Sequence, residues 1–440
     1  MAANKTGKAE LLATLFDDGS FAPLYAEGAV TAGYGCANGQ SIYAVVQDGS
    51  PLGVQDIEKN IRVLKLAAET GCPVVTVYDS TGAKLEGGLE LLNANARLTA
   101  EIARISGVVP QIAVVCGTCA GTSAINAAAA DLCIMAENAE LFLNAPFNAE
   151  DSVKDAGSAA FAARAGVAAI TAPDAIAAVK LAAQVVGILP SNNLAGPAMF
   201  EFAAPEKALN LAQYSAADAV AAIADAGSVV ELYAGYGKNV CAALATVNGS
   251  AVGIVATAKD ALCHTCTAKA ARFVRLCDAY SIPVVTVVNT EGFVKSEGDD
   301  QAGGIRQAAR MAGVYAEATT AKVAVLAGEA IGPIYNVFAA SADWRIAVPG
   351  CTIAPLAPET AVSVLYKEEI YASDNVVAAT KAKAAAYAKE VCGAEAAVAA
   401  GAADAVAAPA AVRGAVAAAL DMLASKRAAR LAKKHGNITL

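Results

Sequence analysis

Histidine is almost absent from this sequence: only His264 and His435 occur among 440 residues. Neither lies in a sequence context that is typical of a Ser-His-Asp triad, so we do not expect a hydrolase of that kind. The inventory favours chemistry that needs no base from the protein. Electrostatic stabilisation of an enolate is chemistry of this type.

Aromatic and charged residues are also scarce, at 5% and 17%, whereas hydrophobic residues reach 56%. Abundant small side chains predict helices and strands that pack closely together. The net charge of −9 provides no basic surface for a phosphate backbone, so we expect no nucleic-acid partner. Residues 1–12 contain three charged side chains and no long apolar run, which argues against a secretory signal and favours a cytoplasmic location.

The longest uncharged stretch, residues 105–130, is long enough to cross a bilayer. It contains Pro110 and three glycines, however, which favour a buried strand followed by a helix. The eleven cysteines are scattered along the chain, so we expect reduced thiols that pack as small hydrophobic side chains.

The second half of the sequence repeats the first. Residues 73–82 (PVVTVYDSTG) return as residues 283–292 (PVVTVVNTEG). The other matched pairs of segments are 15–21 with 223–229, 38–39 with 248–249, 113–122 with 324–333, and 130–131 with 342–343. Five pairs in the same order at nearly constant separation indicate an internal duplication.

Each half alternates short β-rich runs with alanine-rich helical segments, such as residues 57–70 and 269–281. This alternation is typical of a sheet covered by helices, so we predict an α/β protein of two tandem domains. We place these domains at residues 1–214 and 215–440. From about residue 378 we expect the second domain to be helical and to end in a basic tail.

A glycine-rich turn follows a hydrophobic run in each half, at residues 117–122 and 328–333, and leads into a helical segment. Such a turn directs unpaired backbone N–H groups and the positive end of the helix dipole at one point, where an oxyanion could bind. The spacing alone is equally compatible with glycines that only allow close strand–helix packing. The duplication of the turn at matched positions favours the functional interpretation.

Two cysteine pairs, Cys116 with Cys119 and Cys263 with Cys266, have the spacing of a zinc site or a redox pair. Cys116 and Cys119 lie in the glycine-rich turn, where small residues are needed for packing. We therefore favour a packing role and predict no metal site.

Eight segments, in order, resemble the carboxyltransferase subunits of biotin-dependent acyl-CoA carboxylases, those of the propionyl-CoA carboxylase β type. They are residues 30–39, 79–84, 106–112 and 119–122 in the first half, and 269–278, 291–293, 315–319 and 434–440 in the second. The α subunits of biotin-dependent decarboxylases that act on methylmalonyl-CoA or glutaconyl-CoA share these segments. The resemblance covers nearly the whole chain.

The resemblance implies a crotonase-type (ClpP/crotonase superfamily) fold in both halves and an enzyme that moves a carboxyl group between an acyl-CoA and biotin. Paired backbone N–H groups would hold the thioester enolate in the first half and the biotin ureido oxygen in the second. The matching catalytic positions in this sequence are Gly121, Thr122, Gly332 and Ile334. The implied acyl-CoA-binding residues are Ser80, Thr81, Gly82, Ala83 and Lys84, and the implied biotin-binding residues are Gly292, Phe293 and Pro333.

The same resemblance implies a homo-oligomer in which acyl-CoA and biotin meet between domains of different subunits. Biotin would arrive on a biotin carboxyl carrier protein. A biotin carboxylase or a membrane decarboxylase subunit would complete the complex. The sequence leaves open which acyl-CoA is used and whether the reaction runs as a carboxylation or a decarboxylation.

The chain departs from the family pattern at Pro333, which replaces a residue with a backbone N–H. Losing one oxyanion donor typically costs about 3 kcal/mol of transition-state stabilisation. An alternative hypothesis is therefore a catalytically impaired structural or regulatory paralogue within such a complex. A hydratase, isomerase or thioesterase of the single-domain crotonase type is disfavoured, because those enzymes use a positioned carboxylate base and need no duplicated domain.

Overall fold

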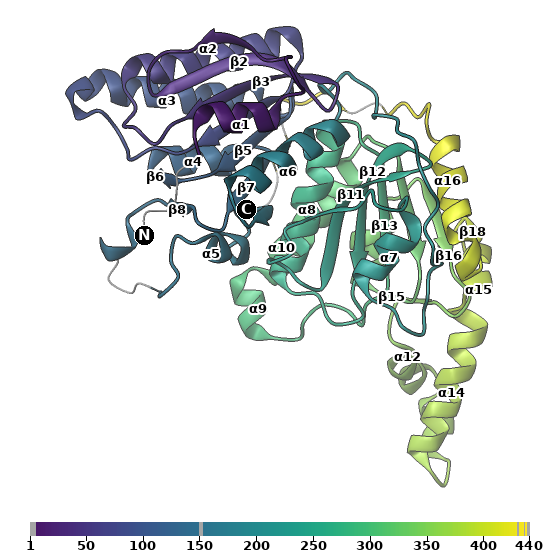
Figure 1. The fold of residues 1–440 in the computed structure, drawn as a ribbon. Coiled ribbons are helices and arrows are strands. Elements are labelled where there is room, and N and C mark those ends of the chain that lie inside the picture. Colours follow the sequence, from purple (N-terminus) through teal and green to yellow (C-terminus); the bar gives the residue numbers. More distant parts are fainter. Residues whose placement is uncertain (1–5, 149–152, 429–430, 435, 438–440) are drawn as a thin grey trace. The chain divides into compact units, whose positions relative to one another are not determined.

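The computed structural model describes residues 6–148, 153–428, 431–434 and 436–437. The chain forms two compact units, which are Met1–Ala198 with Leu232–Tyr236, and Met199–Glu231 with Gly237–Leu440 (Figure 1). Residues 199–214, assigned from the sequence to the first domain, lie in the second unit. His435 and the last three residues of the 434–440 segment lie outside the described residues.

The first unit is built on a seven-stranded sheet with the order β1-β2-β3-β4-β5-β7-β9. Its strands are β1 (Ala22–Tyr25), β2 (Val30–Ala37), β3 (Gln40–Gln47), β4 (Val74–Tyr78), β5 (Gln111–Val115), β7 (Leu132–Ala136) and β9 (Ile170–Ala172). Strands β1 to β3 pair antiparallel, and from β3 onward each pair is parallel. A separate parallel pair joins β6 (Thr118–Ala120) to β8 (Glu140–Phe142).

The described residues of the first unit also form six α-helices. They are α1 (Lys8–Leu15), α2 (Val54–Thr70), α3 (Gly88–Ile105), α4 (Thr122–Ala129), α5 (Ala159–Arg164) and α6 (Ala175–Ile188), with short 3-10 turns at Leu85–Gly87 and Pro146–Asn148. Helix α2 buries Ile57, Ile61 and Leu64, spaced to lie on one helical face. These side chains share a core with Leu98 of α3 and Val45 of β3.

The second unit repeats this architecture with the sheet order β10-β11-β12-β13-β14-β16-β18. Its strands are β10 (Val230–Leu232), β11 (Val240–Val247), β12 (Ser250–Thr257), β13 (Val284–Val288), β14 (Lys322–Leu326), β16 (Trp344–Ala347) and β18 (Ala405–Val406), with the extra pair β15 (Glu329–Ile331) and β17 (Thr352–Ala354). The register is also repeated: Val74 pairs with Gln111, and Val284 pairs with Lys322. The predicted duplication is confirmed.

The second unit contains a larger set of helices. They are α7 (Ala216–Ile223), α8 (His264–Ala279), α9 (Glu297–Ala302), α10 (Gly304–Glu317), α11 (Pro333–Phe338), α12 (Pro358–Leu365), α13 (Lys367–Tyr371), α14 (Val376–Val391), α15 (Ala394–Ala399) and α16 (Val412–Met422), with a 3-10 turn at Pro409–Ala411. Helices α12 and α14 extend away from the second sheet (Figure 1). They have a small core of their own, formed by Val362, Ile370 and Ala384.

An aspartate holds the turn of the β2–β3 hairpin and of its repeat. Asp17 accepts the amide of Gly39 at 2.9 Å, and Asp225 accepts the amide of Gly249 at 2.8 Å. Buried Asp225 also accepts from Thr246 Oγ1 at 2.7 Å and from Arg413 Nη2 at 2.6 Å. Burial raises the pKa of Asp225, but these hydrogen bonds outweigh burial, and the net pKa is lowered.

The C-terminal part differs from its prediction. Instead of one helix running into the tail, α14, α15 and α16 are separate, with β18 between the last two, and α16 ends at Met422. Lys426 of the basic tail is tied back to the unit, because its Nζ lies 2.7 Å from Asp343 Oδ2 and donates to Thr320 O at 2.8 Å. An alanine-rich sequence indicates helical propensity, but it does not predict that Lys426 pairs with Asp343, which is distant in the sequence.

Residues 105–130 form β5 followed by α4, as predicted from their glycines and proline. Within the part of the chain that the structure describes, no helix is both long and apolar enough to span a membrane. The eleven cysteines are all free thiols.

Candidate active site

The first glycine turn begins α4. Gly121 is the N-cap of this helix and has a φ of 59°, a conformation that favours glycine. Its amide donates to the carbonyl oxygen of Phe142 at 3.0 Å, which extends the β6–β8 pair by one bond. Thr122 is the first helical residue, so its N–H has no acceptor within the helix. No other acceptor for it occurs among the described residues.

The loop after β4 is held by a buried serine and by a parallel bridge to residue 52. Ser80 Oγ lies 3.0 Å from the Ser50 carbonyl oxygen and accepts the amide of Gly82 at 3.1 Å. Leu52 donates its amide to Gly82 O at 2.8 Å and accepts from the amide of Lys84 at 2.9 Å. In a parallel bridge the intervening residue directs its N–H away from the partner strand. The amide of Ala83 is thus turned away from residue 52, and the described residues provide no acceptor for it.

The first glycine turn and the loop after β4 line one cavity of about 630 Å³. Gly82 and Ala83 lie on its wall together with Gly121 and Thr122. The remaining lining residues include Leu52, Ile57, Asn95, Phe142, Leu143 and Asn144. The structure thus brings together four residues that were singled out from two distant segments. Ser80 does not line the cavity but supports the loop through hydrogen bonds of its hydroxyl group to Gly82. Thr81 is exposed and is not among the lining residues.

Sequence reasoning missed the polar residues Asn95 and Asn144 of this cavity. Asn95 lies in the amphipathic helix α3, and Asn144 follows β8. No motif marks either position, because both reach the cavity only through the packing of α3 and the pairing of β6 with β8.

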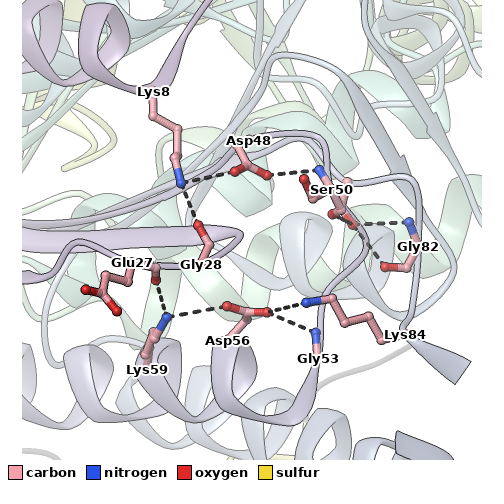
Figure 2. A network of polar contacts seen from close by, with 11 residues as sticks. Lys8, Glu27, Gly28, Asp48, Ser50, Gly53, Asp56, Lys59, Gly82 and Lys84 are labelled. Atoms are coloured by element: carbon pink, nitrogen blue, oxygen red, sulfur yellow. Dashed lines mark hydrogen bonds and ion pairs between the residues drawn. The ribbon is translucent and has the colours of Figure 1, made fainter. Parts of the chain in front are cut away.

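A network of charged side chains fixes the loop that carries Ala83 (Figure 2). Buried Asp56 of α2 accepts the amide of Gly53 at 3.0 Å, and its Oδ2 lies 3.9 Å from Lys84 Nζ. Its other oxygen lies 3.5 Å from Lys59 Nζ, which also donates to Glu27 O at 2.5 Å. The start of α2 and the loop after β4 are therefore tied to one carboxylate.

A second ion pair continues this network (Figure 2). Lys8 Nζ lies 3.1 Å from Asp48 Oδ2 and donates to Gly28 O at 2.8 Å. Asp48 in turn accepts the amide of Ser50 at 3.0 Å. The carbonyl of Ser50 is the group that Ser80 Oγ contacts, so the ion pair supports the same loop.

At the start of the glycine turn, the backbone of Gly117 packs closely against the side chain of Asp79. A Cβ atom on Gly117 would lie 2.1 Å from Asp79 Oδ1, so only glycine fits there. The repeat preserves this contact, since a Cβ atom on Gly328 would lie 2.0 Å from Asn289 Oδ1.

The second unit contains the same two turns with one donor fewer. Gly332 has a φ of 52° and donates its amide to Ala354 O at 2.8 Å, as Gly121 does to Phe142. The first residue of α11 is Pro333, which has no N–H. Ile334, at the second helical position, has an amide without an acceptor in its helix.

Phe293 occupies the place that Ala83 has in the first unit. Leu262 donates to Gly292 O at 2.9 Å and accepts from the amide of Val294 at 3.0 Å, so the amide of Phe293 is directed away from residue 262. Buried Thr290 replaces Ser80 and donates to Asp260 O at 2.8 Å. The described residues contain no group of three metal-ligating side chains that could hold an ion.

Residues 9–438 match the carboxyl transferase domain. The chain belongs to the carboxyl transferase family. This carboxyl transferase is 32% identical to the propionyl-CoA carboxylase beta chain of Saccharopolyspora erythraea, over 100% of its own length and 91% of the relative. It is 32% identical to the methylmalonyl-CoA decarboxylase subunit alpha of Veillonella parvula, over 100% of its own length and 94% of the relative.

A solved structure of transcarboxylase 12S superimposes on this carboxyl transferase with a TM-score of 0.91 and 30% sequence identity. The match covers 99% of the carboxyl transferase and 92% of the 12S chain. That structure is described as a hexamer assembly with methylmalonyl-coenzyme A and methylmalonic acid bound. The predicted fold of two crotonase-type domains and the predicted carboxyltransferase class are confirmed.

Proposed function

We propose that this carboxyl transferase moves a carboxyl group between a short acyl-CoA, methylmalonyl-CoA or propionyl-CoA, and biotin. The observation that carries the proposal is the cavity of the first unit, which both Ala83 and Thr122 line and in which the amides of these two residues lack acceptors among the described residues. Two such donors fit the oxygen of a thioester. Because Gly121 donates its own amide to Phe142, Ala83 takes the second donor position in this proposal.

The proposed chemistry develops negative charge on the thioester oxygen. When a malonyl-type CoA loses its carboxyl group, the C–C bond to that group breaks and its electron pair forms the enolate. Amides that are already oriented stabilise this charge more in the transition state than in the ground state. The start of α4 adds the positive end of a helix dipole at the same point.

We assign acyl-CoA to the loop of residues 80–84. Ser80 and Gly82 shape this loop, Ala83 donates to the thioester, and Lys84 offers a half-exposed ammonium group to the phosphates of CoA. The apolar side chains of Leu52, Ile57 and Phe142 line the cavity beside the amides. They suit a short acyl chain.

We assign biotin to the corresponding turns of the second unit. Biotin, carried on a biotin carboxyl carrier protein, would supply the nitrogen that accepts or returns the carboxyl group. The residues present fit its polar ureido oxygen with the amides of Phe293 and Ile334, while Gly292 and Gly332 shape the turns and Pro333 contributes no donor. We further propose a homo-oligomer that works with a biotin carboxylase or a membrane decarboxylase subunit.

The test is to incubate the purified protein with methylmalonyl-, malonyl- or glutaconyl-CoA, with and without free biotin, and to measure the decarboxylated thioester. We expect product only when biotin is present. Absence of turnover with this panel and with the native biotinylated partner would contradict the proposal. Turnover of enoyl-CoA without biotin would support a hydratase of the crotonase type instead.

The proline at the start of α11 favours a second candidate, a subunit that binds acyl-CoA but transfers carboxyl groups poorly. Binding of a CoA thioester without biotin-dependent turnover would support it. Turnover at ordinary enzyme rates, about 1 to 1,000 s⁻¹, would contradict it.

A further inference from the structure

The two cysteine pairs with the same spacing lie in different surroundings. Cys263 is the N-cap of α8, and its Sγ lies 3.0 Å from the Sγ of Cys266 in the first turn of this helix. Cys263 is partly exposed, and Cys266 is buried. By contrast, Cys116 Sγ is 3.9 Å from the carbonyl oxygen of Ala175, and Cys119 is buried in β6.

Comparison of the repeats shows that the thiols replace a different pair. In the first unit the N-cap of α2 is Gly53, and Asp56, three residues on, accepts its amide at 3.0 Å. The corresponding positions of α8 hold Cys263 and Cys266. The duplicated fold therefore brings these two positions close together in both units, and in the second it brings together two sulfur atoms.

The surroundings give the two sulfurs opposite tendencies to ionise. The hydrogen bond from the Cys266 thiol is the largest influence on Cys263, and with donors from Thr265 it outweighs burial and lowers the pKa of Cys263. The same contact, together with burial, raises the pKa of Cys266. Burial raises the pKa of Cys116 to about 12. A thiolate next to a thiol is the arrangement of an attacking and a resolving cysteine.

We propose that Cys263 and Cys266 form a reversible thiol–disulfide pair that a low-molecular-weight disulfide, such as glutathione disulfide, oxidises. The Cys263 thiolate attacks one sulfur of the small disulfide, whose S–S bond breaks and releases one thiolate. The Cys266 thiol then loses its proton to solvent and attacks Cys263 Sγ, which releases the second small thiol. Two protein thiols are oxidised and one small disulfide is reduced to two thiols.

The pair adjoins the loop that we assign to biotin. Leu262 precedes Cys263 directly and bonds through its amide and carbonyl to Gly292 and Val294, on either side of Phe293. Between the two cysteines, His264 Nδ1 lies 2.6 Å from Asp299 Oδ1 of α9. Oxidation would therefore act on a segment that is bonded to the Phe293 loop. This consequence rests on the proposed function, whereas the disulfide itself does not.

The test uses the full chain, equilibrated with glutathione and glutathione disulfide at several ratios, then denatured, alkylated and digested with trypsin. Lys259 and Lys269 flank the pair, so trypsin releases both cysteines in one peptide. We expect this peptide to lose two hydrogen atoms in mass, reversibly with dithiothreitol, while Cys116 and Cys119 remain fully alkylated. Equal oxidation of both pairs, or no oxidation at the most oxidising ratio, would overturn the proposal.

Two variants separate the roles of the sulfurs. Cys266→Ser is expected to retain a glutathione adduct on Cys263, because no resolving thiol is present, and Cys263→Ser is expected to leave Cys266 unmodified. The reverse pattern would overturn the assignment.

In the oxidised wild type the KM for free biotin should shift while the KM for the acyl-CoA does not. An unchanged KM for biotin would remove the link to the Phe293 loop, and the mass measurement would still decide the disulfide.

Discussion

Pro333 occupies in α11 the position that Thr122 occupies in α4, since each is the first helical residue after a glycine of positive φ. The two turns otherwise share their backbone bonds, from Gly332 to Ala354 and from Gly121 to Phe142. Their backbones differ in hydrogen-bonding capacity, because the amide hydrogen at the first helical position is present in the first unit and absent in the second.

Replacing Thr122 by proline transfers this difference to the first unit. Proline is tolerated at the first helical position, so the fold should persist. We expect kcat for biotin-dependent turnover to fall about a hundred- to thousandfold, because one donor to the thioester oxygen is lost. Thr122→Ala keeps the amide and should retain most of the activity. A folded Thr122→Pro protein with wild-type kcat would contradict the assignment of this donor.

The converse change, Pro333→Ala, adds an amide to the second unit. We expect kcat with free biotin to rise, by up to about a hundredfold if the missing donor limits the rate. Pro358→Ala is a matched control, because Pro358 is the first residue of α12 and lies outside the two turns. Equal effects of both substitutions on kcat would show that Pro333 acts through helix stability and not through its missing N–H.

Gly117→Ala should destabilise the protein, because Gly117 begins the first glycine turn and packs against Asp79. The added methyl group would overlap Asp79 Oδ1 at 2.1 Å, and we expect a loss of about 1–3 kcal/mol in the free energy of unfolding. Denaturant unfolding followed by circular dichroism measures this loss. Gly313→Ala in α10 serves as the control, since a Cβ there meets no atom within 4 Å and alanine favours a helix. A neutral Gly117→Ala would show that Asp79 can move aside.

Asp225→Ala should destabilise the second unit in a pH-dependent way. At pH 7 we expect a loss of about 3 kcal/mol, because Arg413 and the amide of Gly249 lose a buried acceptor. The pKa of Asp225 is lowered in the folded protein, so the unfolded chain binds its proton more readily. The stabilisation is therefore complete above the unfolded pKa, near 4, and disappears as the pH falls through the native pKa.

Urea unfolding of the wild type and Asp225→Ala at neutral and acid pH measures this difference. The gap between the two proteins should narrow below about pH 4. Asp421→Ala, an exposed change in α16, should show no gap at either pH. A gap that stayed constant into acid would assign the effect of Asp225 to packing and not to its charge.

The duplication and the two glycine turns could be predicted from the sequence because they depend on local patterns. Residues 73–82 and 283–292 each contain a buried strand followed by a polar turn, and the spacing to the next glycine turn is nearly the same in both halves. Strands β2 to β5 have the same lengths as β11 to β14, and the connections between them are nearly equal, so the central parts of the two sheets match. The same strand order and register in both units follow from this.

The donors themselves could not be predicted in full. Gly121 was expected to donate to the substrate, yet its amide is bonded to Phe142, which lies more than twenty residues later in a strand of three residues. Such a short parallel pair leaves no periodic signal. The amide of Ala83 is oriented by a bridge to Leu52, a contact between loops that propensities do not describe.

The different properties of the two cysteine pairs could not be predicted from the sequence either. Cys116 with Cys119 and Cys263 with Cys266 are indistinguishable by spacing. What separates them is the environment: a helix N-terminus that favours a negative charge in one case, and a buried strand end that penalises it in the other.

The small core of α12 to α14 makes this segment a cooperative unit of its own. Its core consists of Val362, Ile370 and Ala384, with Tyr366 and Tyr387 packed against them, and Ala361 is the one further buried residue of these three helices. By contrast, every residue of β13 and β14 is buried. A segment with so few buried contacts opens at a small fraction of the global unfolding free energy. Its amide hydrogens should therefore exchange with deuterium long before those of the sheet, and a protease that needs an opened chain would cut there first.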